Sequence, residues 1–115
     1  MKIESLQRKV DFDRVFKKNQ HFGNRHFTFL YMKNQLDHNR LGIMVSKKVS
    51  KKAVVRNRIR RQIREAYRLQ MDGFASGVDC IIIAKGSCVN GEYKDLYKSL
   101  GHLFYKTGLK VSVKK

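Results

Sequence analysis

Acidic residues, proline and long apolar runs are all scarce in this sequence, and each shortage narrows what the chain can be. Only 9 Asp and Glu accompany 26 Lys and Arg among the 115 residues, so the formal net charge is +17. Proline is absent and glycine occurs 8 times, so no stretch resembles an interdomain linker, and the length fits one domain over residues 1–115. No apolar run approaches the roughly 18 residues of a membrane-spanning helix, and the opening MKIESLQRKV lacks the apolar middle of a signal peptide. These absences predict a cytoplasmic protein.

The two cysteines are also consistent with a cytoplasmic protein. Cys80 and Cys88 are too few and too loosely spaced for a zinc knuckle or a redox CxxC pair. Cys80 lies in an apolar run, which predicts a buried, reduced thiol.

The acids and histidines do not form the pattern of a hydrolytic site. A protein nuclease that uses two metal ions needs several carboxylates converging on them, whereas the acids here are scattered singly. Asp11 and Asp13 are two positions apart and therefore diverge on a helix. We interpret the histidines, which show no ligand spacing, as surface or satisfied core residues: His21, His26, His38 and His102. We predict no catalytic residue and no metal site in the protein.

Positive charge is concentrated in residues 46–68, SKKVSKKAVVRNRIRRQIREAYR, which nonetheless show helical periodicity. At about 100° per residue, one face collects the apolar side chains Val55, Ile59, Ile63, Ala66 and Tyr67. Arg56, Arg60 and Arg64 form a row along one edge of that face, and Arg58 lies towards the other flank. Like charges stacked at i, i+4 cost stability unless a polyanion completes them. We therefore favour an RNA or DNA contact surface over an ordinary solvated basic face.

The remaining periodicity predicts the order α-β-β-α-β-α, an α+β fold built as an α-β sandwich, with room for an extra short strand. Helices are expected over residues 8–18, 53–70 and 91–106, the last of them capped by Asn90. Strands are expected over 25–33, 41–46 and 78–84. The tail 107–115 is basic, and we expect it to fray. A helix between two strands of one sheet is right-handed by default.

The first two strands have unlike faces and are predicted to form a hairpin across the polar turn 34–39. In the first strand, Phe27, Phe29 and Tyr31 alternate with His26, Thr28, Leu30 and Met32. One face is bulky throughout, and the other is small or mixed. This mixed face is where we expect something other than protein to lie.

The run Ser50 to Arg64, SKKAVVRNRIRRQIR, resembles the signature of the protein subunit of bacterial ribonuclease P: an alanine, two variable positions, Arg-Asn-Arg, an aliphatic residue, two basic residues, and Ile-Arg. The resemblance extends along nearly the whole chain. It includes FDRVFKK at 12–18, RHF at 25–27, SKK at 46–48 and DCIIIA at 79–84, in the expected order.

This resemblance implies a fold like that of ribosomal α-β proteins, with a left-handed crossover around the arginine helix in place of the default hand. It also implies a protein that is the non-catalytic subunit of an RNA-based endonuclease. In that family, a catalytic RNA with bound Mg²⁺ hydrolyses one phosphodiester of precursor tRNA and so removes the 5′ leader. The protein binds the catalytic RNA and the leader, and no obligate protein partner is expected.

Two binding surfaces are predicted. The first binds the catalytic RNA through phosphate contacts and comprises Lys47, Lys48, Lys51, Lys52, Arg56, Asn57, Arg58, Arg60, Arg61, Arg64 and Arg68. The second binds the single-stranded leader between the first helix and the mixed face of the sheet; it comprises Phe12, Phe16, Thr28, Leu30, Arg56 and Arg60. For Phe12 and Phe16 the competing interpretation is core packing, since their i, i+4 spacing is common in cores.

Two other functions compete with this interpretation. A basic ribosome-associated RNA-binding protein has the same charge and fold class, although the arginine motif favours the first reading. A protein-only nuclease would cleave without added RNA.

Overall fold

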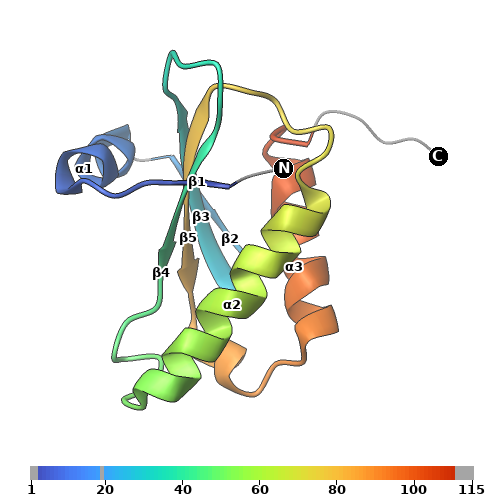
Figure 1. Ribbon diagram of the computed structural model, residues 1–115. Coiled ribbons are helices and arrows are strands. Elements are labelled where there is room, and N and C mark those ends of the chain that lie inside the picture. Colours follow the sequence, from blue (N-terminus) through green and yellow to red (C-terminus); the bar gives the residue numbers. More distant parts are fainter. Residues whose placement is uncertain (1–2, 19, 111–115) are drawn as a thin grey trace.

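Figure 1 shows a computed structural model of the chain, which describes residues 3–18 and 20–110. A five-stranded sheet in the order β1-β4-β5-β3-β2 separates α1 on one face from α2 and α3 on the other. The strands are β1 (Glu4–Ser5), β2 (His21–Gly23), β3 (Phe27–Lys33), β4 (Arg40–Met44) and β5 (Val78–Ala84). The helices are α1 (Lys9–Lys18), α2 (Ala53–Gln70) and α3 (Tyr93–Lys106), with a 3₁₀ turn, η1, at Gly86–Val89.

The predicted order of the six main elements is confirmed. The bounds of α2 and β5 coincide with the prediction, because the apolar stripe of α2 and the continuous apolar run of β5 mark both elements clearly. Two very short edge strands, β1 and β2, were not placed individually. Each has three residues or fewer, which is too short for a period of two to be recognisable in the sequence.

The predicted hairpin between the first two main strands is wrong. β5 lies between them, antiparallel to β3 and parallel to β4. This order puts the most continuously apolar strand at the centre of the sheet, where both of its faces are covered. The chain therefore passes from β4 through α2 to β5 in a parallel crossover; its left-handed sense stays a prediction of the resemblance.

The two faces of the sheet carry separate cores. Phe27, Phe29 and Leu41 face α2 and α3, where Phe104 and the fully buried Ile63 complete the larger core. On the α1 face a smaller core is formed by Leu6, Val15, Leu30 and Ile81. The alternation predicted for the first main strand is thus confirmed within β3, where the "mixed" side is the face that α1 covers; His26, just before β3, instead contacts Ser99 of α3.

Two expectations near the C-terminus are wrong. Asn90 does not cap α3; it ends η1, and α3 follows Glu92 without a side-chain cap. The segment directly after α3 is also fixed: Leu109 is buried, and the Lys110 Nζ donates to the carbonyls of Gln70 (2.8 Å) and Asp72 (3.0 Å). The ammonium group thereby satisfies carbonyls that the end of α2 leaves open. Residues 111–115 of the predicted frayed tail lie outside the described part.

Candidate nucleic-acid interface

The exposed side of α2 is a basic surface without acidic partners. Within residues 3–18 and 20–110, none of the arginines at positions 56, 58, 60, 61 and 64 forms an ion pair with an acid. The exception on this helix is Arg68, whose guanidinium donates to both carboxylate oxygens of Glu65, at 3.0 and 2.7 Å. This pairing lowers the pKa of Glu65 and leaves Arg68 less available to a phosphate than its neighbours.

Three of these arginines are positioned by backbone carbonyls. Arg56 donates to Ser50 O at 2.9 Å, and Arg58 donates to Val89 O, at the end of η1, at 2.8 Å. Arg60 donates to Asn57 Oδ1 at 3.1 Å, and its other nitrogen reaches Val45 O at 3.4 Å. Carbonyl contacts fix the side chains without neutralising their charge. Arg58 therefore lies on the flank opposite Arg56 and Arg60, as predicted.

The lysine segment before α2 forms a compact turn that ends at the start of the helix. The hydroxyl of Ser46 accepts from Lys48 N (3.3 Å), and that of Ser50 accepts from Lys52 N (3.2 Å). Lys52 is the N-cap, its side chain makes no capping bond, and the first turn of α2 contains no acid. The positive end of the helix dipole thus adds to the exposed lysine charges of this turn.

A second surface is the part of the sheet beyond α1. In Figure 1, α1 lies beside only part of its face of the sheet, and the remainder runs towards the start of α2. Strand register places Met44, Ile83 and Thr28 in one row across β4, β5 and β3. Met44 is exposed, and the other two are half-buried. These side chains form a floor that mixes apolar and polar atoms.

The helix side of this surface is formed by α1. The Phe12 ring packs against Gly42 so closely that a Cβ at position 42 would lie 2.7 Å from the ring. Phe12 is half-buried, and Phe16, one turn later, is 37% exposed. Core packing therefore holds most of Phe12, whereas Phe16 presents part of its ring to solvent.

Leu30 needs a correction, because it is 4% exposed and belongs to the small core under α1. A residue buried there has no face left for an RNA base. Sequence reasoning missed Met44 and Ile83, which occupy the exposed part of the same face. The sequence shows that Met44 and Ile83 lie at alternate positions along β4 and β5, but it does not show that these two strands are neighbours.

The floor continues to Arg60 around the edge of the sheet. β1 pairs with β4 only at Arg40 and Leu41, so the second half of β4 is an edge. The contact between Arg60 and Val45 O brings a guanidinium to this edge, one residue beyond Met44. Arg56 contacts the adjoining turn at Ser50. Arg60 thus reaches the edge of the second surface, whereas Arg56 lies against the turn before α2; their contact with a leader stays a prediction.

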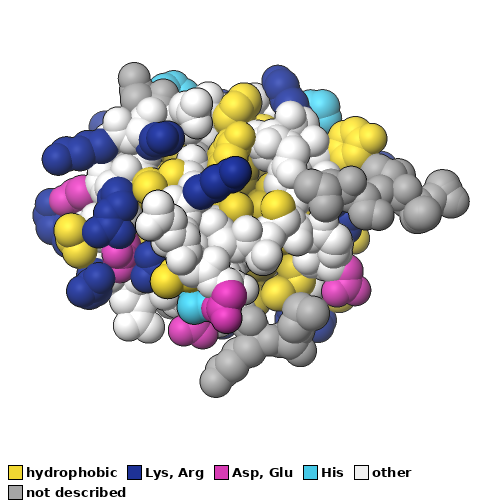
Figure 2. Space-filling model, turned by 90° about the horizontal axis from the view of Figure 1, so that it is seen from above, with side chains coloured by type: hydrophobic (Ala, Val, Ile, Leu, Met, Phe, Trp, Pro, Cys, Tyr) yellow, Lys and Arg dark blue, Asp and Glu magenta, His cyan; other side chains and the backbone are white. Residues whose placement is uncertain are grey.

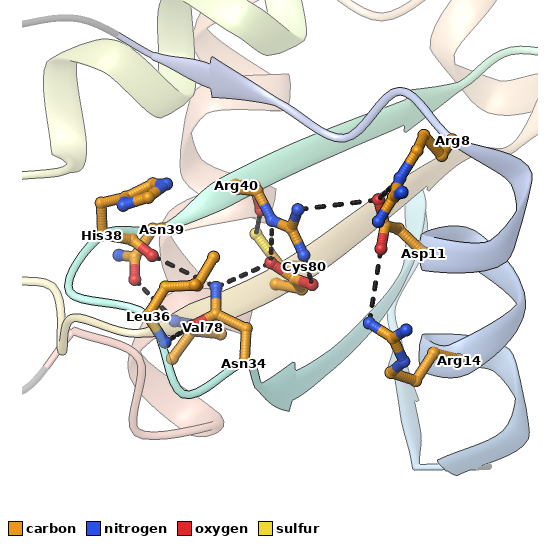
Figure 3. A network of polar contacts seen from close by, with 11 residues as sticks. Arg8, Asp11, Arg14, Asn34, Leu36, His38, Asn39, Arg40, Val78 and Cys80 are labelled. Carbon is orange, nitrogen blue, oxygen red and sulfur yellow. Dashed lines mark hydrogen bonds and ion pairs between the residues drawn. The ribbon is translucent and has the colours of Figure 1, made fainter.

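A buried ionic network fastens α1 to the sheet (Figure 3). Arg40 donates to both carboxylate oxygens of Asp79, at 2.8 and 2.7 Å, and lies 3.6 Å from Asp11 Oδ2. Asp11 also accepts from Arg8 and Arg14, each at 3.3 Å. The hydrogen bond from Arg8, and then the charges of Arg40 and Arg14, hold the pKa of Asp11 below its ordinary value against the opposing effect of burial. Asp11 and Asp79 are thus each paired with arginines in a structural role.

Acids and bases alternate around α1 more than around α2. Figure 2 looks at the molecule from above Figure 1 and shows Lys and Arg gathered on the α1 side, with Asp and Glu among them. Lys9 pairs there with Asp13 at 3.1 Å, which also confirms that Asp11 and Asp13 point apart. The densest run of cations without acidic partners in the described ranges therefore lies on α2 and the turn before it.

The other polar residues show no catalytic arrangement in the described ranges. No group of three or more His, Cys, Asp or Glu is placed to hold a metal ion there. His26 is buried, and its Nδ1 lies 2.6 Å from Ser99 Oγ, as expected for a satisfied core histidine.

Burial raises the pKa of the Cys80 thiol to about 12, and that of Cys88 to about 11. No helix in the described ranges could cross a membrane.

Comparison with known proteins identifies the family. A family model described as Ribonuclease P matches residues 1–108. The chain belongs to the ribonuclease P protein family. It is 39% identical, over 96% of each chain, to the ribonuclease P protein component of Clostridioides difficile. The solved RNase P protein of Staphylococcus aureus is 33% identical, with a TM-score of 0.85 over 95% of this chain and 99% of that one.

A third relative, the RNase P protein of Thermotoga maritima, is 29% identical, with a TM-score of 0.79 over 96% of this chain and 99% of that chain. Family membership makes the protein an RNA-binding component of tRNA processing that acts within an endoribonuclease complex.

Proposed function

We propose that this chain is the protein component of a cytoplasmic ribonuclease P in which the catalytic RNA performs the chemistry. The RNA would hydrolyse one phosphodiester of precursor tRNA, releasing the 5′ leader and leaving a 5′-phosphate on the mature tRNA. The observation that carries this proposal is the set of carbonyl-anchored arginines on α2, namely Arg56, Arg58 and Arg60, which have no acidic partners among the described residues. Like charges held in place in this way are a preformed site for a polyanion.

The Mg²⁺ required by such a reaction does not fit this protein. A two-metal site needs several converging carboxylates. The two buried carboxylates described above are already occupied by arginines, and no suitable group exists in residues 3–18 and 20–110. We therefore assign Mg²⁺ to the RNA, and the protein's role is to bind and position both RNA strands.

The two surfaces would bind RNA through different interactions, namely phosphate contacts on one and base stacking on the other. The α2 surface and the lysine turn supply about six to eight phosphate contacts, which corresponds to a salt slope of about −0.7 to −0.9 per contact. The floor at Thr28, Ile83 and Met44 suits a flexible strand whose bases stack without sequence preference, and the exposed ring of Phe16 on α1 would add a stacking surface. The leader would follow this floor towards Arg60.

One assay tests the proposal. Labelled precursor tRNA is incubated at low Mg²⁺ with the protein alone, the catalytic RNA alone, or both. We expect 5′-leader release only from the combination, and release by RNA alone only when Mg²⁺ is raised. Cleavage by the protein alone would overturn the proposal, as would the absence of any gain on combining the two. Intact single-stranded RNA of equal length, used as a competitor, controls for non-specific binding.

A further inference from the structure

Gly42 lies in the middle of β4, where the backbone does not require a glycine. Its φ lies outside the left-handed region, so any residue could adopt its conformation. A glycine inside a strand costs stability, and it often marks a position that another group approaches closely. Here that group is the ring of Phe12, whose Cζ, Cε2 and Cε1 atoms lie 2.7, 2.9 and 3.2 Å from a Cβ built at position 42. The ring therefore stands with its tip on the strand, in the space of the missing side chain.

Strand register shows what surrounds the ring on this face of the sheet. Gly42 pairs with Ile81 of β5, which belongs to the small core against which Phe12 packs. The residues two positions away on β4, on the same face, are Arg40 and Met44. Arg40 belongs to the ionic network that fastens α1, and Met44 begins the exposed floor about 7 Å along the strand. The ring thus stands at the boundary between the core under α1 and the floor proposed for the leader.

Phe12 is half-buried, so part of its side chain is accessible. The small core encloses it on the side of Ile81, and the ionic network lies on the side of Arg40. Neither covers the side towards Met44, where the floor begins. An aromatic ring in this place extends the floor by a surface on which a base can stack. An alanine at position 42 would force the ring out of this place, either by rotation of the side chain or by a shift of α1.

We propose that Gly42 is a positioning residue for the 5′ leader and that it acts through Phe12. By leaving room for the ring at the level of the sheet, it places an aromatic surface at the end of the floor that Thr28, Ile83 and Met44 form. The inference rests on the proposed function, because it needs the leader to follow this floor. It adds a requirement that the charge of α2 does not explain, namely a glycine at one position of the sheet.

The test measures how tightly the reconstituted holoenzyme binds precursor tRNA with a leader of several nucleotides, and how tightly it binds mature tRNA. Gly42→Ala should weaken precursor binding by about 5- to 10-fold, as expected for the loss of one aromatic stacking contact, and leave mature tRNA binding unchanged. Phe12→Leu lacks the three ring atoms that a Cβ would meet and should lose the same share of precursor affinity. In the Phe12→Leu background, adding Gly42→Ala should cost nothing further, because the methyl group then has room.

Two control variants separate positioning from a general loss of stability. Gly86→Ala adds a Cβ that meets no atom of the described residues within 4 Å, and it should behave like the wild type. Phe104→Leu removes packing from the larger core on the other face of the sheet. It should therefore lower the melting temperature and leave the ratio of precursor to mature tRNA affinity unchanged.

Several results would overturn the inference. They are an unchanged ratio of precursor to mature affinity in Gly42→Ala or Phe12→Leu, equal losses for both tRNAs in Gly42→Ala, a further loss when the two changes are combined, and a ratio that falls equally in Phe104→Leu. The result for Phe12→Leu is decisive even where Gly42→Ala does not fold. A wild-type holoenzyme that binds precursor no more tightly than mature tRNA, or that gains no cleavage activity from the protein, would instead refute the proposed function.

Discussion

Neutralising two arginines of α2 should change the salt dependence of RNA binding by a calculable amount. Arg61 and Arg64 are exposed, and neither has an acidic or carbonyl partner within the described chain, so replacing them removes charge without breaking a structural contact. Each phosphate contact contributes about 0.7 to 0.9 to the slope of log K against log salt. The double variant Arg61→Gln/Arg64→Gln should therefore flatten the slope by about 1.4 to 1.8.

The assay is filter binding of the catalytic RNA at several salt concentrations between about 50 and 200 mM, the range over which such contacts change affinity strongly. Arg68→Gln is the control on the same helix: its charge is already paired with Glu65, so its removal should change the slope much less. Circular dichroism checks that all variants keep their helix content. An unchanged slope for the double variant, or an equal change for Arg68→Gln, would refute the assignment of this surface to phosphates.

The other predictions concern the leader surface, the ionic network and the thiols. Phe16→Ala should weaken binding of precursor tRNA with a leader of several nucleotides but not of mature tRNA, whereas Val10→Ala, also on α1 and exposed, should change neither; equal losses for both tRNAs would make Phe16 structural. Arg40→Met leaves the buried carboxylate of Asp79 without a cationic partner and should lower the free energy of unfolding by about 3–5 kcal/mol, measured by urea denaturation; a loss below about 1 kcal/mol would contradict the network's importance. Because the pKa of Asp11 is lowered on folding, its contribution is present above the unfolded pKa of about 3.9 and is lost as pH falls through the folded value, so Asp11→Asn should reduce the loss of stability in acid. The Cys80 thiol, whose pKa is raised to about 12, should resist thiol reagents at pH 8 until the protein unfolds; rapid labelling of the native chain would show that the thiol is accessible.

The sequence predicted local structure well where one periodicity dominated. The apolar stripe of α2 gave both its limits and its inward face, with Ile59 and Ile63 fully buried. The run 78–84 likewise gave β5 directly. In both cases the side chains that pack are close in sequence, so a pattern of local spacing was enough.

Prediction failed where pairing depended on distant segments. The polar turn 34–39 looked like a hairpin loop, yet β5 inserts between the strands that it connects. That insertion decides which residues form the exposed floor, so Met44 and Ile83 were missed and Leu30 was included wrongly. The ion pair between Asp11 and Arg40 was hidden for the same reason, because Arg40 and its second partner, Asp79, come from strands far along the chain.

The terminal backbone groups of α2 find side-chain hydrogen-bond partners at the C-terminal end only. Lys110 closes its C-terminal carbonyls, while the amides of its first turn have no side-chain cap and no nearby acid. The first turn should therefore open most readily in the free protein and exchange its amide hydrogens fastest. A phosphate seated there would supply the missing acceptor, so part of the energy of assembly is spent on finishing the helix. RNA binding should therefore slow amide exchange in the first turn of α2 more than in the rest of that helix.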